Sequence, residues 1–351
     1  MIRHTRDHEK FTVVIRHSRE SGNPLPPDHQ GFTLVRMLTL CGALALALVG
    51  GCDKLPSRPK TAFNADSAFS YTRQQVAFGP RVPGTAGAER AGDWIVTMMR
   101  ARADTVIVQR WKHKTLKGDS IPLRNILARF NPKATQRVLY ITHWDTRPMA
   151  DSDPVLGNRN DPILGANDGA SGVGLFVALG DALKKVRAGV GVDLLFVDGE
   201  DYGASFDPPY ADVLLGSQYF VNNLPSPDYK PMYGVLWDMI ADADLNILQE
   251  PNSMNAAPEV VTRVWQKAAD LGYAKYFVPK ALPFAITDDH VPFIEKGFRV
   301  VDVLDYDYGP RDAAGQVTVN YHHTLQDTMA HISAKSLQIV GDVALSLLMD
   351  G

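Results

Sequence analysis

Five short segments of this 351-residue sequence carry residue types that bind metal ions. Each segment lies at or just after an apolar or turn-rich stretch. The residues are His143 and Asp145, Asp168, Glu200 and Asp201, Asp238, and His323. Zinc accepts imidazole nitrogens and carboxylate oxygens, and a catalytic zinc keeps one position open for water or substrate. The recurrence of these types predicts a catalytic metal centre assembled from distant parts of the chain.

Three stretches that lead into these segments are typical of buried strands. Residues 138–142, 192–198 and 232–237 are short and apolar, and an acid or a histidine stands at the carboxyl end of each. In open α/β sheets, ligands bind beyond the carboxyl ends of the strands, so residues far apart in the sequence converge there. We therefore expect a three-layer α/β/α sandwich around a mixed, mostly parallel sheet, with the site at its carboxyl edge.

Glu200 and Asp201 are adjacent at one predicted strand end, so they can divide the work of a catalytic site. The chain leaving the strand can turn one carboxylate toward the metal and the other toward the substrate. A free carboxylate next to a metal-bound group forms an acid/base pair. The pair therefore predicts a metal-assisted reaction that includes a proton transfer.

The remaining pattern predicts the elements around the site. Amphipathic helices are expected at residues 67–78, 86–103 and 170–186, and an antiparallel edge at residues 104–111 and 126–130. The loop at residues 202–214 is expected to line the pocket. Four further expectations concern single residues: Trp144 and Trp237 pack in the core, Asp242 and Asp244 are solvated turn acids, His290 is structural, and His331 lies on a surface helix.

Composition fits one globular enzyme domain behind a targeting segment. The chain is 45% hydrophobic and 21% charged, which are ordinary globular proportions. Residues 38–49 form an uncharged, mostly apolar run of 12 residues, too short to span a bilayer, and lead into Val49-Gly50-Gly51-Cys52. This resembles a bacterial lipoprotein signal. A buried helix would also suit that length, but it leaves Cys52 unexplained.

The resemblance to a lipoprotein implies four divisions of the chain. Residues 1–36 are an extension without function, with the true start near Val35 or Met37; residues 37–51 are the signal; residues 52–65 are a tether; and residues 66–351 are the catalytic domain. Cys52 would be lipidated. We therefore expect a protein of the bacterial cell envelope, anchored to a membrane and facing the periplasm or the exterior.

Charge and cysteine content narrow the functional classes further. Removal of residues 1–51 takes away six basic and four acidic residues, which changes the formal charge from -3 to -5. Nothing in this balance favours nucleic acid as a partner. Of the two cysteines, Cys41 would leave with the signal and Cys52 would carry lipid, so we expect a domain without disulfides. We also expect a monomer.

The metal-ligand segments also resemble a known family. From about residue 67 to the C-terminus, five motifs are similar in order and spacing to those of the zinc-dependent M28 peptidases, including the glutaminyl cyclases. The motifs are HWDTRP (143–148), GANDGASG (165–172), DGED (198–201), WD (237–238) and HTLQDT (323–328).

This resemblance implies a role for each residue. Asp168 would bind zinc together with Asp201 and His323, and in the aminopeptidases it would bridge to a second zinc. His143 and Asp238 would complete that second site, or lie behind the first if only one zinc is bound. Glu200 matches the general base, and Asp145 the carboxylate that orients His143. One zinc is expected in a cyclase and two in an aminopeptidase.

A sixth motif, ITDDHVPF at residues 286–293, distinguishes the two branches. Cyclases of the family tend to have an acidic pair before this histidine, and Asp288 is the additional acid. The resemblance thus implies a glutaminyl-peptide cyclotransferase that acts on peptide or protein N-termini. Asp238, His322, Tyr202 and Phe206 would bind the substrate. A di-zinc aminopeptidase is the alternative, and a non-catalytic binding protein is disfavoured because the ligand positions and Glu200 are intact.

Overall fold

A six-stranded sheet forms the centre of the structure, a computed structural model that describes residues 61–204 and 209–350. The order of the strands is β1-β2-β4-β3-β5-β8. Their bounds are β1 (Thr105–Lys114), β2 (Ser120–Phe130), β3 (Arg137–His143), β4 (Gly191–Val197), β5 (Tyr233–Asp238) and β8 (Val300–Leu304). Strands β4, β3, β5 and β8 are parallel, while β1 and β2 form an antiparallel edge. The prediction of a mixed, mostly parallel sheet is confirmed.

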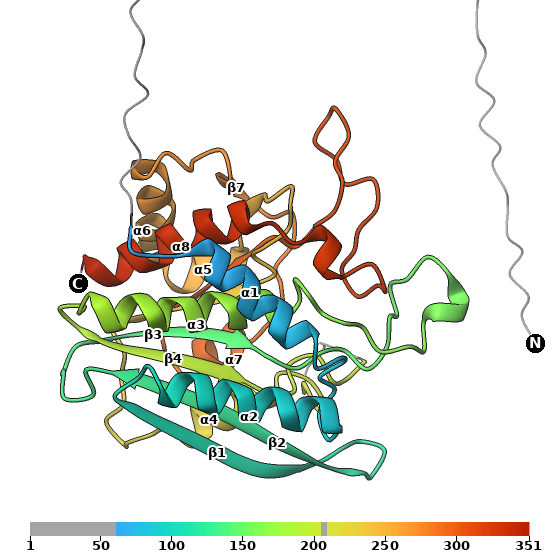
Figure 1. Ribbon diagram of the computed structural model, residues 1–351, viewed down its shortest axis with the longest axis horizontal. Helices are drawn as coiled ribbons and strands as arrows, with labels where there is room; N and C mark the ends of the chain where they lie inside the picture. Colours follow the sequence, from blue (N-terminus) through green and yellow to red (C-terminus); the bar gives the residue numbers. More distant parts are fainter. Residues whose placement is uncertain (1–60, 205–208, 351) are drawn as a thin grey trace, which may run out of the picture. The chain divides into compact units, whose positions relative to one another are not determined.

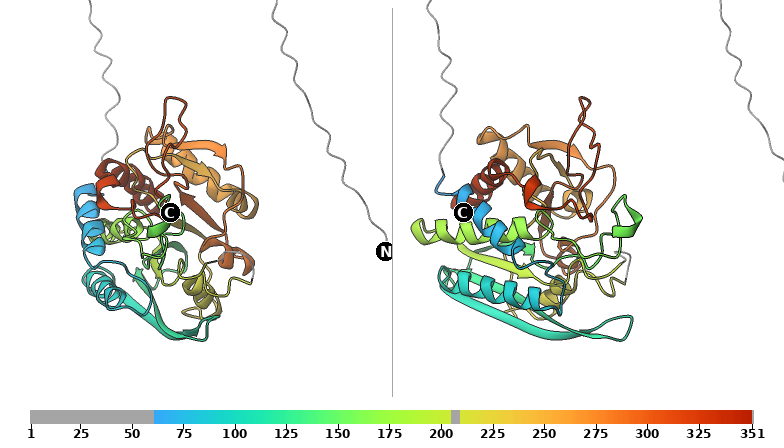
Figure 2. Two further views of the ribbon diagram at one scale, coloured as in Figure 1. Left: turned by 90° about the vertical axis from the view of Figure 1, so that its right-hand side faces the viewer. Right: turned by 45° about the vertical axis from the view of Figure 1, so that its right-hand side comes forward.

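Helices cover both faces of this sheet (Figures 1 and 2). One face carries α2 (Ala86–Arg100), α3 (Ala170–Lys185), α6 (Pro258–Asp270) and α8 (Ala334–Met349), with α1 (Ala65–Val76) packed on α3 and α8. The other face carries α4 (Leu215–Asn222) and α7 (His290–Glu295). The smaller elements are η1 (Leu156–Asn158), α5 (Pro251–Ala256), η2 (Met329–His331) and a two-stranded sheet of β6 (Ile247–Gln249) and β7 (Phe277–Ala281).

The alternation of side chains along the central strands explains why both faces need helices. On β3, Val138 and Tyr140 join the hydrophobic core beneath α3 and α8, whereas Leu139 and Ile141 join the core beneath α4 and α7. Successive residues of a strand point to opposite faces, so a strand that is apolar throughout must be covered on both sides. This double burial fixes the strand ends where the metal-ligand residues lie.

The predicted helices agree with the structure to within two or three residues. The antiparallel edge is longer than predicted, because β2 begins at Ser120 rather than residue 126. Pro122 has no N–H group to donate to a neighbouring strand, so it argues against a strand that is paired on both sides. The first half of β2 pairs only with β1, because its pairing with β4 begins at Ile126. Phe63, which the sequence places in the tether, is buried in the core.

Single-residue expectations outside the site have mixed outcomes. Trp144 and Trp237 are buried in the core, as predicted. Asp244 is exposed, but the expectation of a solvated acid is wrong for Asp242, which is 2% exposed and accepts the Gly309 N–H at 3.3 Å. Burial raises the pKa of Asp242. His331 is half-buried, lies in the 3₁₀ helix η2, and its ring is tilted against that of Tyr321.

Several predictions fall outside the described residues: the extension, the signal, Cys52 and Phe206. Within residues 61–204 and 209–350, no helix combines the length and the apolar character needed to cross a membrane.

Close packing of α3 on the sheet sets the position of the loop that carries Asp168. Gly172 lies in the first turn of α3, directly over β3 and β5. A Cβ atom there would collide with the Thr142 side chain and would lie 2.8 Å from the Trp237 carbonyl oxygen. Because both obstacles belong to central strands, neither has room to move.

We expect Gly172→Ala to lower the free energy of unfolding by about 1–3 kcal/mol, because an added methyl group overpacks the core. Alanine normally stabilises a helix relative to glycine, so a loss would report the clash itself. Gly157→Ala is the control, since nothing lies within 4 Å of a Cβ at that position. Urea denaturation of both variants provides the measurement. Equal stabilities would contradict this account of the packing.

Candidate metal centre and active site

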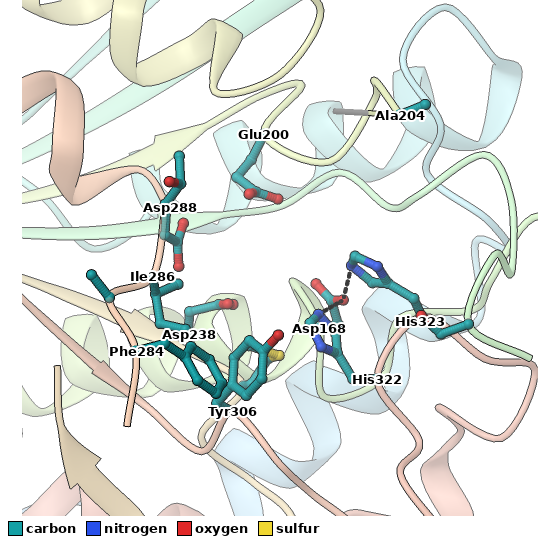
Figure 3. A pocket seen from close by; sticks show the side chains of 14 residues that line it. Asp168, Glu200, Ala204, Asp238, Phe284, Ile286, Asp288, Tyr306, His322 and His323 are labelled. Atoms are coloured by element: carbon teal, nitrogen blue, oxygen red, sulfur yellow. Dashed lines mark ion pairs between the residues drawn. The ribbon is translucent and has the colours of Figure 1, made fainter. Parts of the chain in front are cut away.

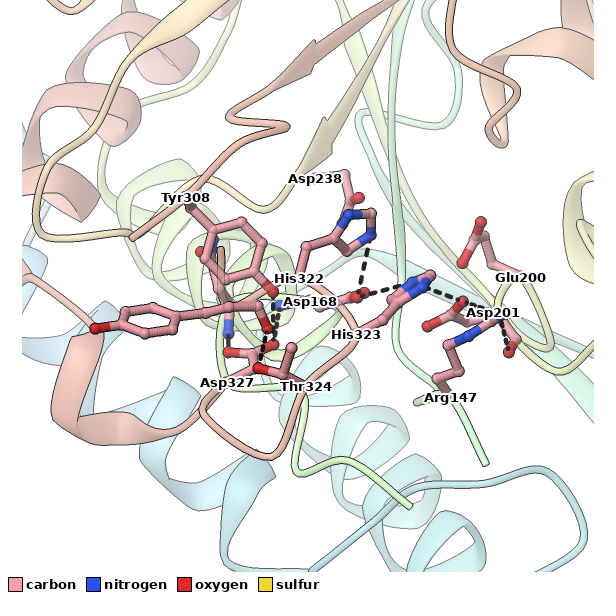
Figure 4. A network of polar contacts seen from close by, with 12 residues as sticks. Arg147, Asp168, Glu200, Asp201, Asp238, Tyr308, His322, His323, Thr324 and Asp327 are labelled. Carbon is pink, nitrogen blue, oxygen red and sulfur yellow. Dashed lines mark hydrogen bonds and ion pairs between the residues drawn. The ribbon is translucent and has the colours of Figure 1, made fainter. Parts of the chain in front are cut away.

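The ends of three parallel strands and two loops bring the metal-ligand residues together (Figure 4). His143 is the last residue of β3 and Asp238 the last of β5, while Glu200 and Asp201 follow β4. Asp168 lies just before α3, and His323 lies in the loop before η2. The sheet therefore supplies a fixed edge, against which the two loops place Asp168 and His323.

Asp168 lies between two groups of ligand atoms. Its Oδ1 atom is 3.0 Å from the His143 Nε2 atom, which is also 3.0 Å from Asp238 Oδ1. Its Oδ2 atom is 3.6 Å from the His323 Nε2 atom, which is 3.2 Å from Asp201 Oδ1. Asp168 therefore has potential ligand atoms on both sides.

Unpartnered polar atoms indicate that a cation belongs in this cluster. The Oδ2 atoms of Asp168 and Asp201 and the Nδ1 atom of His143 are buried without a hydrogen-bond partner. Buried carboxylate oxygens in this state are costly unless a cation or a donor compensates them. Imidazole and carboxylate are the ligands that zinc prefers outside thiolate sites. The residues present thus fit zinc.

Asp145 fixes the positions of Glu200 and Asp201 by accepting hydrogen bonds from their backbone N–H groups. Its two carboxylate oxygens accept the N–H groups of Glu200 and Asp201, each at 3.2 Å. Its Oδ1 atom also lies 3.5 Å from His143 Nδ1. One buried carboxylate therefore links the end of β3 to the loop after β4.

Asp327 performs the equivalent task for Asp168, and the sequence reasoning did not single it out. It accepts the backbone N–H of Asn167 at 2.7 Å and of Asp168 at 3.0 Å, and the Tyr308 hydroxyl at 3.1 Å. Burial and repulsion from Asp168 raise the pKa of Asp327 to about 7. The motif at residues 323–328 contains this aspartate, but the motif alone does not reveal its partners.

Two buried arginines are also part of the site. The Arg147 guanidinium donates to Asp201 Oδ1 at 2.9 Å and forms two hydrogen bonds to Asp151. Burial opposes ionisation of Asp201, but His323 and Arg147 outweigh it and lower the pKa of this carboxyl. Arg81 donates to the carbonyl oxygens of Trp144 and Gly165, which flank the metal-ligand loops. Arg147 belongs to the HWDTRP motif, but the sequence does not reveal the partners of either arginine.

A cavity of about 460 Å³ opens over this cluster (Figure 3). Glu200, Asp238, Asp288 and His322 line it, as does an apolar wall that includes Phe284, Ile286 and Tyr306.

Of the predicted substrate-binding residues, Asp238 and His322 thus line the cavity. Tyr202 does not: its ring packs against Ile121, Leu123 and Leu215, because that apolar cluster offers the ring more burial than the cavity does. From the predicted pocket-lining loop, Ala204 reaches the cavity.

Glu200 and Asp288 face the cavity as buried carboxyl groups. Burial, with repulsion from Asp201 and Asp288, raises the pKa of Glu200 well above its ordinary value. Burial, with repulsion from Asp238 and Asp289, does the same for Asp288. A raised pKa suits a carboxyl group to hold and return a proton during a reaction. The cavity therefore contains two groups suited to proton transfer.

His290 lies behind the cavity wall and has a structural role, as predicted. It is fully buried between Glu250, whose Oε2 atom is 3.2 Å from Nε2, and Asp302, whose Oδ2 atom is 3.6 Å from Nδ1. Glu250 also accepts the backbone N–H of Ile286 at 3.0 Å. The loop that carries Ile286 and Asp288 is therefore fixed from behind.

The fold and the donor set define an α/β protein with a candidate zinc site, and similarity to known proteins gives the family. Residues 125–348 match the model of peptidase family M28. The chain belongs to this family.

Solved structures of two kinds resemble the chain. A Porphyromonas gingivalis glutaminyl cyclase has a TM-score of 0.77 and 36% identity, covering 83% of this chain and 99% of that one. A Zn-dependent exopeptidase from Parabacteroides distasonis has a TM-score of 0.76 and 36% identity, covering 84% of this chain and all of that one, 100%. The prediction of the fold is confirmed.

Relatives with similar sequences are also of two kinds, an aminopeptidase and a glutaminyl-peptide cyclotransferase. Aminopeptidase YwaD of Bacillus subtilis is 23% identical over 303 residues, which are 82% of this chain and 58% of that protein, so the chain spans little more than half of its length. Glutaminyl-peptide cyclotransferase of Bos taurus is 25% identical over 256 residues, 64% of this chain and 68% of that protein. Both relatives are enzymes, in agreement with the predicted enzyme class, and the family's zinc dependence agrees with the predicted cofactor.

We expect Asp327→Asn to weaken zinc binding by roughly 10–100-fold, because an amide nitrogen would face the N–H groups that position Asp168. Asp312→Asn is the matched control, since Asp312 also accepts two backbone N–H groups but in an exposed turn away from the cavity. Competition with a chromophoric chelator gives both zinc dissociation constants. Equal affinities in the two variants would show that Asp327 does not position the ligand loop.

Proposed function

We propose that the protein is a zinc-dependent glutaminyl-peptide cyclotransferase. Its substrate is a peptide or protein with an N-terminal glutamine, and its products are an N-terminal pyroglutamate and ammonia. The observation that carries the proposal is Asp288, a buried acid that lines the same cavity as Glu200 in addition to the metal-ligand carboxylates Asp168 and Asp238. Hydrolysis requires one base, whereas cyclisation benefits from an additional acid that holds the leaving amide.

Zinc is expected to be held by Asp168 and His323 with the nearby Asp201, and a second site is available at His143 and Asp238. When bound, zinc would polarise the γ-carbonyl oxygen of the substrate glutamine as a Lewis acid. The chain's own contribution is to hold the N-terminal residue folded, so that amine and γ-carbon meet. Because both reacting groups belong to one residue, positioning supplies much of the rate.

Glu200 is the proton carrier in this proposal. The substrate α-amine forms a bond to the γ-carbon, and Glu200 accepts the proton that the amine loses. The bond from the γ-carbon to the amide nitrogen then breaks, and Glu200 returns the proton to that nitrogen, which leaves as ammonia. Asp288 and Asp238 face the same space (Figure 3), so they can accept hydrogen bonds from the amine and the leaving nitrogen. Atoms and charge balance without a further reactant.

A di-zinc aminopeptidase is the second candidate, and the position of Asp168 favours it. This carboxylate lies between His143 and His323, so the cluster offers ligands for two ions. In that reaction Glu200 would accept a proton from the attacking water. Ligand number alone does not distinguish the two activities.

We also propose that the protein is a lipoprotein of the bacterial cell envelope. The support is the sequence at residues 38–52, where an apolar run of signal length ends at Cys52. Peptide N-termini outside the cytoplasm would then be the accessible substrates.

A zinc-loaded sample should convert a peptide with N-terminal glutamine into the cyclised peptide and ammonia, and should leave a matched peptide with N-terminal leucine intact. Glu200→Gln should lower kcat/KM by about 10²–10⁴-fold, because it preserves shape and removes the proton carrier. Asp288→Asn should also slow cyclisation. Mass spectrometry distinguishes the products.

Asp161→Asn, at an exposed acid outside the cavity lining, is the control. Release of leucine from the second peptide would establish the aminopeptidase instead. Unchanged cyclisation by Asp288→Asn would remove the observation on which the choice of branch depends.

A further inference from the structure

A group of basic side chains lies at the amino edge of the sheet, where β3, β4, β5 and β8 begin, opposite the catalytic cavity. The loop between β2 and β3 and the loop between α3 and β4 meet there. They line a cavity of about 520 Å³ whose wall includes Lys133, Lys184 and Arg187. These three side chains and that of Lys185 are exposed. We refer to these four residues as the basic surface.

Nearby acids offset only part of this positive charge. Arg102 also lines the cavity, but it is paired with Asp181 at 2.9 Å. Among the described lining residues, Asp104 is the single acid, and its carboxylate accepts the Asn131 N–H at 2.8 Å. In the part of the chain that the structure describes, none of the four residues of the basic surface forms an ion pair with a carboxylate. The surface therefore presents an excess of positive charge to its surroundings.

Stabilisation of a helix end accounts for only two of these residues. Lys184 and Lys185 lie in the last turn of α3, where basic side chains interact favourably with the helix dipole. Lys184 also donates to the Ala101 carbonyl oxygen at 2.9 Å. Lys133 and Arg187 lie in loops, and no contact among the described residues explains their charge. These two residues indicate that the basic surface faces a negatively charged partner.

The carboxyl edge of the sheet has the opposite charge. Exposed acids outnumber exposed basic residues in the loops that follow β3, β5 and β8. The acids are Asp161, Asp244, Asp307 and Asp312, and the exposed basic residue is Arg159. An anionic surface would therefore attract the amino edge and repel the edge that carries the catalytic cavity. Because charges are screened over about 8 Å at physiological ionic strength, the attraction requires close contact.

The chain enters the domain at the same amino edge. The Thr61 hydroxyl donates to the Asp342 carboxylate on α8, and the Phe63 ring occupies the space over Gly341 that a Cβ atom would need. Thr61 also lines a cavity together with Val186, which lies between Lys185 and Arg187. Figure 1 shows the start of the described chain and the end of α3 on the left, and the loops after β3 and β8 on the right.

The lipid anchor proposed above would attach to the domain at this edge. Eight residues, 53–60, separate Cys52 from Thr61, and they span at most roughly 30 Å. A domain of this size is roughly 50 Å across, so the connection is shorter than the domain is wide. Residues 53–60 also contribute three basic residues against one acid. The anchor would therefore hold the basic surface near the membrane.

We propose that the basic surface rests on the headgroups of anionic phospholipids in the membrane that holds Cys52, and that the catalytic cavity points away from that membrane. This orientation depends on the lipoprotein assignment proposed above and is independent of which candidate activity is correct. The substrates would be the N-termini of peptides and proteins that approach from solution. Chains embedded in the same membrane would not reach the cavity.

Vesicle binding tests the basic surface without the lipid. The sample is a chain that begins at position 52 and carries Cys52→Ser, which keeps every described helix and strand. At low ionic strength it should bind vesicles that contain phosphatidylglycerol and not vesicles of phosphatidylcholine alone. The combined changes Lys133→Gln, Lys184→Gln and Arg187→Gln should weaken this binding roughly 100-fold, at about fivefold for each basic residue near a charged membrane.

The matched control removes three exposed lysines at the carboxyl edge, through Lys112→Gln, Lys114→Gln and Lys117→Gln. Both triple variants have the same net charge, so a difference between them reports position rather than total charge. Circular dichroism checks that each variant is folded. Equal losses of binding in the two variants would overturn the proposal. Failure of the unaltered surface to prefer vesicles with phosphatidylglycerol would overturn it as well.

The orientation is measured on the lipidated protein in vesicles that contain a fluorescent headgroup. Cys41 and Cys52 are the only cysteines of the sequence, and the first would leave with the signal while the second carries lipid. Thr135→Cys and Lys117→Cys therefore each provide a single site for a dye, at the amino and carboxyl edges respectively. Energy transfer between dye and headgroup should be more efficient for the dye at position 135. The reverse order would show that the cavity faces the membrane.

Failure of the lipoprotein assignment is distinguished by mass spectrometry of the protein extracted from membranes. Absence of lipid on Cys52 would refute the anchor, and the vesicle experiment would still decide whether the basic surface binds anionic phospholipids. Lipid on Cys52 together with equal binding of the two triple variants would refute the basic surface and leave the anchor in place.

Discussion

Burial of an excess of negative charge at one edge of the sheet is the constraint on which the site depends. Four carboxylates lie close together there, and each is at most 5% exposed: those of Asp145, Asp168, Asp201 and Asp238. Buried carboxylates persist only where hydrogen bonds or cations compensate them. Backbone N–H groups satisfy Asp145, and Arg147 pairs with one oxygen of Asp201, but Asp168 and Asp201 each retain an unpartnered Oδ2 atom. A metal ion bound by this cluster would compensate these oxygens.

The same constraint explains why carboxylates also hold the loops. Asp145 and Asp327 each accept two backbone N–H groups, and these groups belong to the acidic pair after β4 and to the Asp168 loop. An amide or hydroxyl could accept fewer such bonds and would carry no charge to strengthen them. Asp201 and Asp168 are thus each positioned by a second buried acid, whose own charge adds to the negative charge of the site. The buried negative charge that strengthens metal binding therefore lowers the stability of the metal-free protein.

The sequence predicted those parts of the site that strand ends determine, and it missed those that depend on distances between loops. His143 and Asp238 end apolar strands, so alternation and sheet topology were sufficient to bring them together. Tyr202 follows a strand by only a few residues, yet an apolar cluster captures its ring. Arg147 and Asp327 act through partners more than 50 residues away, which no local pattern reveals. The sequence therefore predicted the fold and the ligand types, but not which side chain meets which.

The metal-ligand residues and the residues of the cavity wall lie on different parts of the fold. This separation is compatible with one fold that supports either cyclisation or peptide hydrolysis. The metal-ligand residues lie at strand ends and in the loops that buried carboxylates fix. Asp288, in contrast, lies in the loop between β7 and α7, which also supplies Phe284 and Ile286 to the cavity wall. Glu250 binds the backbone of this loop, so its side chains can change without loss of the loop's position. The proposed function therefore depends on the residues that this loop presents rather than on the fold. A cyclase and a peptidase can differ there while sharing every ligand.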